Sequence, residues 1–209
     1  VFSRPDMKHS EVKSAVDETI ERSPVSVETS QDTMLNGPIQ GGLFPDLRRN
    51  SASEMAKFDF SVHPIGGIVP VMEQQRYREY AKIMMSTLPF LPSNRPVHMF
   101  GCGHPMLFPM SIALGADLFD SAAYALFARD GRILSPWGTE KLEGLMEWPI
   151  MMPCISGVTP ELVRKMPKDE RMKLLAKYNL EITLAELARC RQAVRDGNIW
   201  RLVEQRSHQ

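Results

Sequence analysis

Short apolar runs alternate with longer segments of helical spacing along the first 120 positions of the chain. Each run has the length and composition of a strand, and glycine-rich turns follow the first three. The predicted strands lie near Thr33–Ile39, Phe60–Ile65, Val97–Phe100 and Asp117–Phe119, and helices are expected near 45–58, 74–88 and 106–114. Repeats of strand, turn and helix are typical of parallel βαβ units, so the predicted fold class is α/β.

Helices dominate the pattern outside this region. Lys8–Arg22 is predicted as an amphipathic helix. A proline-rich joint, Trp148–Pro160, precedes a C-terminal part in which Thr159 resembles an N-cap followed by proline. The helices expected there are Pro160–Met166, Lys168–Tyr178 and Thr183–Arg206, the last divided at Gly197. We therefore expect an α/β domain over residues 1–147 and a helical one over 148–209.

The net charge of the whole chain indicates no partner, but the charge of its C-terminal part differs from the total. The 209 residues are enough for one large domain or most of one, and 25 basic residues balance 25 acidic ones. Residues 159–209, however, carry eleven basic and seven acidic side chains. This excess is consistent with contact to a polyanion, although a modest excess is more often typical of a solvated helical face.

The three cysteines, Cys102, Cys154 and Cys190, are odd in number and widely spaced. They exclude a disulfide framework and a CxxC metal knuckle, and they suit the reducing cytoplasm, where we expect the protein. No apolar run reaches the roughly 20 residues of a membrane span, so no membrane association is expected. The chain begins without Met or a signal peptide, and we expect it to be part of a longer protein.

Polar residues and glycines gather where the predicted strands end. Gln40 precedes the Gly41–Gly42 turn, and Gly66 and Gly67 follow the second strand. Glycine lets the backbone approach a flat ligand, and the Gln40 amide offers the donor and the acceptor that suit a purine edge. A single turn of this kind is more often a tight βα connection that binds nothing. Several at one sheet edge, together with Asp120, favour a ligand site.

Asp120 ends the fourth predicted strand and permits two interpretations. It is either the N-cap of a helix that begins at Ser121, or a rigidly held carboxylate that attacks an electrophilic sugar carbon. The histidines add no metal pattern: His104 is more typical of hydrogen-bonded structure in a turn than of a catalytic residue. The other four, His9, His63, His98 and His208, are dispersed.

Seven segments make the chain similar to a known family. They read LNGPIQGG, PIGGIVPVME, RPVHMFGCGHPMLF, ALGADLFDSAAYALFARDGR, WGTEKLE, TPELVRKMPKDERMKLLAKYNL and AVRDGNIWRLVEQR. With these segments the chain resembles the archaeal branch of the tRNA-guanine transglycosylase family, which builds archaeosine. The likeness covers nearly the whole sequence.

The resemblance implies a (β/α)₈ TIM-type barrel, of which residues 1–147 would form a partial barrel with about four βα units. It also implies exchange of the D-loop guanine-15 of tRNA for 7-cyano-7-deazaguanine through a covalent Asp–ribose intermediate. Asp120 falls on the nucleophile position, Gln40 on a position that reads the base edge, and Gly66 and Gly67 where backbone lines the base pocket. Arg129 and Arg132 would hold tRNA phosphate.

Two departures from the family pattern stand out. The first strands and the acidic proton-transfer partner are not in the chain, and half a barrel leaves open sheet edges. A second chain or a homodimer is therefore a possible completion of the barrel.

The second departure concerns a structural zinc site. Ile150, Met152 and Ile155 stand at the family's cysteine positions, and Tyr178 at its histidine position. Because Cys154 alone cannot make a four-ligand site, we expect no zinc and no other cofactor. Apolar packing by Ile150, Met151, Met152 and Ile155 is expected in its place.

Three functions remain open on the sequence. The first is the transglycosylase itself, acting on tRNA and 7-cyano-7-deazaguanine. The second is an archaeosine synthase-type paralogue, which the lost zinc ligands favour. The third is a non-catalytic tRNA-binding subunit. Retention of Gln40, Gly66, Gly67 and Asp120 favours the first.

Overall fold

The computed structural model describes residues 4–30 and 33–207, which form two compact units. Unit 1 contains the described residues up to Cys102 together with Leu114–Asp120. Unit 2 contains Gly103–Ala113 and the described residues from Ser121 onward. The domain division expected between residues 147 and 148 stays a prediction. Among the described residues, none of the helices combines the length and the apolar character needed to cross a membrane.

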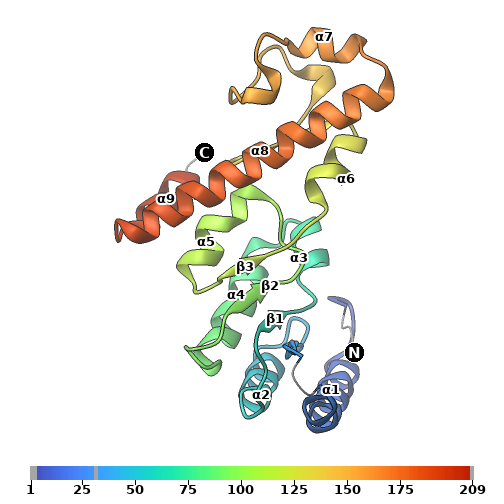
Figure 1. Ribbon diagram of the computed structural model, residues 1–209. Helices are drawn as coiled ribbons and strands as arrows, with labels where there is room; N and C mark the ends of the chain where they lie inside the picture. Colours follow the sequence, from blue (N-terminus) through green and yellow to red (C-terminus); the bar gives the residue numbers. More distant parts are fainter. Residues whose placement is uncertain (1–3, 31–32, 208–209) are drawn as a thin grey trace. The chain divides into compact units, whose positions relative to one another are not determined.

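A small parallel sheet lies at the centre of unit 1 (Figure 1). Its strands are β1 (His63–Ile65), β2 (Val97–Met99) and β3 (Leu118–Phe119), hydrogen-bonded in that order. The strand expected at Thr33–Ile39 is reduced to two parallel bridges, Asn36 with Val62 and Ile39 with Ile65. The predicted mixed α/β class and parallel pairing are therefore confirmed, whereas closure into part of a barrel stays a prediction.

Four helices accompany this sheet: α1 (His9–Thr29), α2 (Pro45–Met55), α3 (Val69–Glu73) and α4 (Tyr77–Thr87). α1 begins where predicted, because the Lys8 N–H donates to Glu11 Oε2 at 2.7 Å in a capping box. It continues beyond Arg22, since Ser23 is buried and its hydroxyl contacts Met55 Sδ at 3.3 Å.

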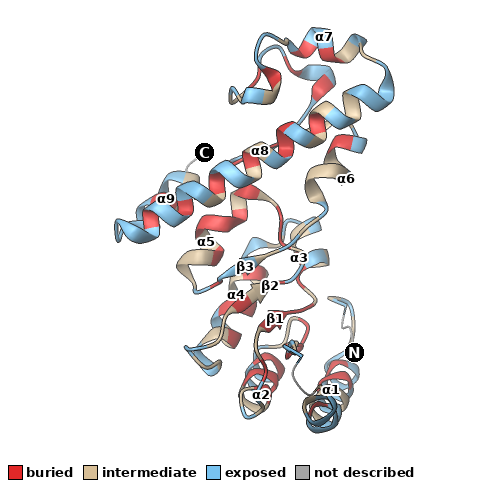
Figure 2. Cartoon of the chain, in the orientation of Figure 1, coloured by how far each residue is buried: buried red, intermediate tan, exposed pale blue. Residues whose placement is uncertain are grey.

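The core of unit 1 joins helices and strands. Val12 and Val16 of α1 pack with Leu47 of α2, and α2 packs against α4. β1 is buried along its length (Figure 2). On β2, Val97 and Met99 are buried while His98 between them is partly exposed. This alternation is the period-2 pattern of a strand with one face in a core.

Unit 2 is mostly helical. Its helices are α5 (Phe108–Ala113), α6 (Ala123–Arg129), α7 (Pro160–Lys165), α8 (Lys168–Arg195) and α9 (Ile199–Ser207), and a hairpin joins β4 (Arg132–Ser135) to β5 (Gly138–Lys141). Short 3₁₀ turns cover Leu88–Phe90 in unit 1, and Pro105–Leu107, Leu142–Gly144 and Pro153–Ile155 in unit 2. The predicted cap of α7 is confirmed, because Thr159 Oγ1 accepts from the Leu162 N–H at 3.3 Å.

The predicted break between Tyr178 and Thr183 is wrong, because α8 runs through it without interruption. Asn179 lies there fully buried: its Oδ1 accepts from the Leu134 N–H at 2.8 Å, and its Nδ2 donates to the Tyr124 and Arg132 carbonyls, each at 3.1 Å. These bonds tie α8 to β4 and α6, so a polar residue that reads as a break stabilises the packed helix. The division expected at Gly197 is confirmed, since α8 ends at Arg195 and α9 starts at Ile199.

An aromatic cluster around Tyr178 holds α8 to the segment that contains Trp148 and Ile150. The rings of Trp148 and Tyr178 lie 5.0 Å apart, and the Tyr178 hydroxyl donates to the Ile150 carbonyl at 3.0 Å. Ile155 is fully buried here, with Ile150 and Met152 packed around the cluster. The expected apolar packing is thus confirmed for these three residues and wrong for Met151, which is 64% exposed.

The donor set of this region does not fit a zinc ion. In the described part of the chain, no three His, Cys, Asp or Glu side chains are close enough to share a metal. Burial and the neighbouring Glu181 raise the pKa of Cys154 to about 11, which disfavours the thiolate that zinc requires. Burial likewise raises the pKa of Tyr178 to about 12, so its phenol stays a hydrogen-bond donor.

We predict that Tyr178→Phe lowers the free energy of unfolding by about 1 kcal/mol, because the Ile150 carbonyl loses its donor while the ring packing remains. EDTA should leave the midpoint of thermal unfolding unchanged for both proteins. Denaturant unfolding, with and without chelator, measures both effects. A chelator-dependent loss of stability in the unmodified protein would contradict this account.

Candidate active site

Four chain segments of unit 1 end at the same edge of the parallel sheet. Parallel strands have their carboxyl ends on one side, and the bridged segment at Ile39 follows the same direction. Gln40, Gly66, Gly101 and Asp120 therefore follow one another along this edge, in the order of the strands that precede them. The structure brings together the expected base-reading residues and the expected nucleophile at one sheet edge.

Asp120 is held by two donors on a single oxygen. The Gly101 N–H donates to Asp120 Oδ1 at 2.7 Å, and His98 Nε2 donates to the same Oδ1 at 2.8 Å. Within the described residues of unit 1, Oδ2 has no hydrogen-bond donor. The Asp120 side chain is 52% exposed, whereas that of His98 is 16% exposed. The carboxylate is thus fixed in the protein at one oxygen and open at the other.

The register of β2 and β3 explains this pair. His98 lies opposite Leu118 in the parallel ladder, and Asp120 is two residues further on the same face as Leu118. Phe100 shares that face, being two residues beyond His98, and its ring meets the imidazole edge-on at 5.4 Å. A histidine on one strand therefore reaches the carboxylate that ends the next.

The N-cap interpretation of Asp120 is wrong. α6 begins at Ala123, and its N-cap residue is Ala122. The Ala123 N–H instead donates to Ser121 Oγ at 2.9 Å. With no helix to cap, the carboxylate remains available for chemistry.

Gln40 and Gly66 fit against each other. A Cβ on Gly66 would lie 2.5 Å from Gln40 Nε2, so a larger residue at this position would displace the amide. The Gln40 N–H donates to Ser51 Oγ at 3.1 Å, which anchors its backbone. Its Oε1 is buried without a hydrogen-bond partner in the described part of the chain. An orphan buried acceptor of this kind has a free energy cost that a ligand donor would remove.

A buried arginine connects the two loops that carry the expected base-reading residues. Arg48 of α2 is fully buried, and its Nε donates to the Gly42 carbonyl at 2.9 Å. Its Nη1 donates to the Ile39 carbonyl at 3.1 Å and its Nη2 to the Gly66 carbonyl at 2.9 Å. Burial lowers the pKa of Arg48 to about 9, so the guanidinium stays charged at neutral pH, and three carbonyl acceptors favour that charged form.

This arginine also sets the direction of a backbone donor. In a trans peptide the C=O and the following N–H point in opposite directions. Because the Gly66 carbonyl faces Arg48, the Gly67 N–H points away from it. Gly67, which is only partly buried, thus presents a fixed donor on the other side of the loop.

The remaining sequence candidates lie in unit 2. Arg129 ends α6 and is exposed, and Arg132 starts β4 with its guanidinium 4.1 Å from the centre of the Phe127 ring. His104 Nδ1 accepts from the Met106 N–H at 3.2 Å, as expected of a structural turn histidine. Burial and the nearby Arg132 charge lower the pKa of His104 to about 4, so it is neutral. His208 lies outside the described residues.

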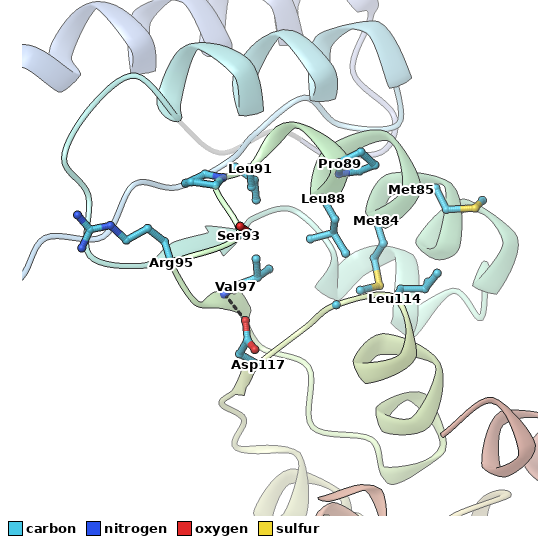
Figure 3. Close-up of a pocket in the computed structure, with 12 residues that line it drawn as sticks. Met84, Met85, Leu88, Pro89, Leu91, Ser93, Arg95, Val97, Leu114 and Asp117 are labelled. Atoms are coloured by element: carbon cyan, nitrogen blue, oxygen red, sulfur yellow. Dashed lines mark hydrogen bonds between the residues drawn. The ribbon is translucent and has the colours of Figure 1, made fainter. Parts of the chain in front are cut away.

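A pocket of about 640 Å³ opens at the other, amino end of these strands (Figure 3). Its wall is apolar, including Met84, Leu88 and Leu114. Asp117 and Arg95, the charged residues in its lining, already bind other groups of the protein: Asp117 Oδ2 accepts from the Val97 N–H at 2.8 Å, and Arg95 pairs with Asp59. We therefore place the chemistry at the carboxyl edge.

Two residues of the site escaped the sequence reasoning. His98 was grouped with dispersed histidines. The available signal was its spacing: it lies on a predicted strand, two residues before Phe100 on the same face and three before the turn at Gly101. Nothing in the sequence indicated that Arg48 is buried, because a charged residue in a predicted helix is usually exposed to solvent.

Comparison with known proteins identifies the family. The chain belongs to the queuine tRNA-ribosyltransferase family, whose profile matches residues 2–209. It is similar to proteins named tRNA-guanine(15) transglycosylase. Those of Methanocaldococcus jannaschii and Methanococcus vannielii are 46% identical in alignments that cover 97% of this chain and 32% of each relative. That of Thermococcus kodakarensis is 43% identical over 203 residues, 97% of this chain and 35% of the relative. The chain thus spans about a third of the length of these relatives.

We predict that Arg48→Met lowers the free energy of unfolding by at least about 3 kcal/mol, since three buried carbonyls lose their donor at roughly 1 kcal/mol or more each. Arg49→Met is the matched control: the neighbouring Arg49 is exposed and lies over the Phe90 ring at 5.4 Å, so its loss should cost no more than about 1 kcal/mol. Urea unfolding of the two variants compares them directly. Equal losses would show that the carbonyl contacts contribute nothing.

Proposed function

We propose that the protein exchanges a guanine of tRNA for another base through a covalent intermediate on Asp120. In the finer form of the proposal, guanine-15 of the D-loop is replaced by 7-cyano-7-deazaguanine in archaeosine biosynthesis. The observation that carries the proposal is the Asp120 carboxylate, held at Oδ1 and open at Oδ2, on the sheet edge that also bears Gln40 and Gly66. Membership in the family and the names of its relatives support the same reaction class.

The proposed chemistry has two halves. Asp120 Oδ2 forms a bond to C1′ of the ribose while the C1′–N9 bond breaks, and the electron pair leaves with guanine, which takes a proton from water. The incoming 7-cyano-7-deazaguanine gives its N9 proton to water, and N9 attacks C1′. The C1′–Oδ2 bond then breaks and the carboxylate is restored, so no cofactor is needed.

Three groups are proposed to hold the base. Gln40 Oε1 would accept from the amino group on the base edge, and the Gly67 N–H would donate to an acceptor on the same edge. Phe100, 54% exposed on the same face of the strands as Asp120, offers an apolar surface for stacking on the heterocycle.

The remaining parts of the proposal concern tRNA and assembly. Arg129 and Arg132 are proposed to contact phosphate, with Arg191, Arg195 and Arg201 of α8 and α9 adding exposed positive charge. The parallel sheet is proposed to be part of a (β/α)₈ barrel. β3 is the last strand of this sheet and Leu118 is 44% exposed, which is consistent with completion of the barrel by further polypeptide.

We predict that Asp120→Asn abolishes a covalent adduct with tRNA that the unmodified protein forms. An amide is a far weaker nucleophile than a carboxylate, although it is nearly the same size. The full chain, with any subunit that copurifies, is incubated with tRNA and 7-cyano-7-deazaguanine, and the adduct is detected on a denaturing gel. Base exchange is followed in parallel with radiolabelled guanine.

The other outcomes identify the alternatives. Base modification that persists in Asp120→Asn would point to a paralogue acting on the inserted base, which the apolar residues at the zinc positions favour. Binding of tRNA without modification by either protein would point to a non-catalytic subunit.

We also predict that tRNA affinity falls steeply with salt, through counterion release. Replacing Arg191, Arg195 and Arg201 by Gln should make the slope of log affinity against log salt shallower by about 2, at roughly 0.7 to 0.9 per phosphate contact. Arg189 is left intact because it donates to the buried Glu186. Lys13→Gln on α1 is the control, since Lys13 pairs with Asp17. An unchanged slope in the triple variant would remove these helices from the interface.

A further inference from the structure

We propose that His98 is a positioning residue for Asp120, and that the clamp on Oδ1 makes Oδ2 the oxygen that attacks the ribose. The inference rests on the proposed function and gives a role to His98, which has none in that proposal. Its basis is that two donors from separate positions of the chain, the His98 imidazole and the Gly101 N–H, converge on one carboxylate oxygen at 2.8 and 2.7 Å.

The backbone half of the clamp is rigid. Gly101 has φ +82°, in the left-handed region, and a Cβ there would lie 2.5 Å from Val69 Cγ2. The turn after β2 therefore requires glycine, and this conformation aims the Gly101 N–H at Asp120. The preceding hydrogen-bonded register of β2 with β3 fixes the distance between the two strand ends.

The imidazole half is held from two sides. His98 sits within β2, so its backbone is fixed by the ladder to β1 and β3. The Phe100 ring packs edge-on against it. With Nε2 donating to the carboxylate, the proton must lie on that nitrogen, and the tautomer follows from the contact.

The hydrogen bonds to Asp120 Oδ1 also fix the orientation of Oδ2. Rotation of the carboxylate that exchanged Oδ1 and Oδ2 would break both hydrogen bonds at once, and both are charge-assisted. Oδ2 is therefore kept in one orientation toward the space above the sheet edge. A nucleophile aimed in advance at its carbon reacts faster than one that must search, and a misplacement of 1 Å can cost about 100-fold in rate.

His98→Leu and His98→Gln test the proposal. Leucine keeps the approximate bulk of the imidazole and removes the donor, whereas the Gln amide nitrogen can occupy the place of Nε2. The measurement is the single-turnover rate of adduct formation at saturating tRNA, with tRNA affinity and thermal unfolding measured on the same samples. We expect His98→Leu to slow adduct formation by about 100-fold at unchanged tRNA affinity, and His98→Gln to recover at least a tenth of the original rate.

The chain offers a matched control in a second histidine–aspartate pair. His9 Nε2 lies 2.7 Å from Asp46 Oδ2 and joins α1 to α2. His9→Leu removes the same type of contact and should leave the adduct rate unchanged. A loss equal to that of His98→Leu would show a general effect on the fold and would overturn the proposal.

The remaining outcomes separate this inference from the proposed function. Adduct formation at the original rate in His98→Leu overturns the role of His98 and leaves base exchange intact. No adduct with any form of the protein, including the unmodified one, overturns both. If His98→Leu does not fold, His98→Gln decides: recovery of at least a tenth of the original rate supports the role, and a slower rate overturns it.

Discussion

The hydrogen bonds of the buried Arg48 guanidinium hold together the two loops that carry Gln40, Gly66 and Gly67, the proposed base-reading residues. The guanidinium binds carbonyls of two loops that are separated along the chain, at Ile39 and Gly42 on one side and Gly66 on the other. A buried charge without a carboxylate partner is stable only if its donors are satisfied, and these carbonyls provide the acceptors. The same contacts fix the peptide planes that place Gln40 and Gly67, so the stability of the loops and the proposed recognition of the base depend on one set of hydrogen bonds.

The sheet edge was predictable because its signals are local. A glycine turn after an apolar run marks the end of a strand, and parallel strands share an edge, which is why Gln40, Gly66 and Asp120 were found together. His98 was not found, because its contact with Asp120 arises from the register between two strands 20 residues apart. Arg48 was missed for a different reason: helical periodicity does not reveal which charged residue a loop will cover.

The helical part shows how tertiary contacts override local preference. Asn179 reads as a break in a helix, yet three backbone partners make it a joint between α8, β4 and α6. Tyr178 and Trp148 hold the region where the resemblance implied a metal site, through ring packing and one hydrogen bond. The β4–β5 hairpin was not predicted, because its four-residue strands and Pro136–Trp137 turn lack the Asn-Gly signal of a tight hairpin.

The continuity of α8 has a mechanical consequence. At 1.5 Å per residue its 28 residues form a rod about 42 Å long, with Tyr178 of the aromatic cluster about three turns from its start and Arg191 and Arg195 in its last turns. A rod without a hinge keeps its two ends at constant separation and constant relative azimuth. The helix therefore fixes the distance and the direction of the arginine positions relative to the Trp148–Tyr178 contact.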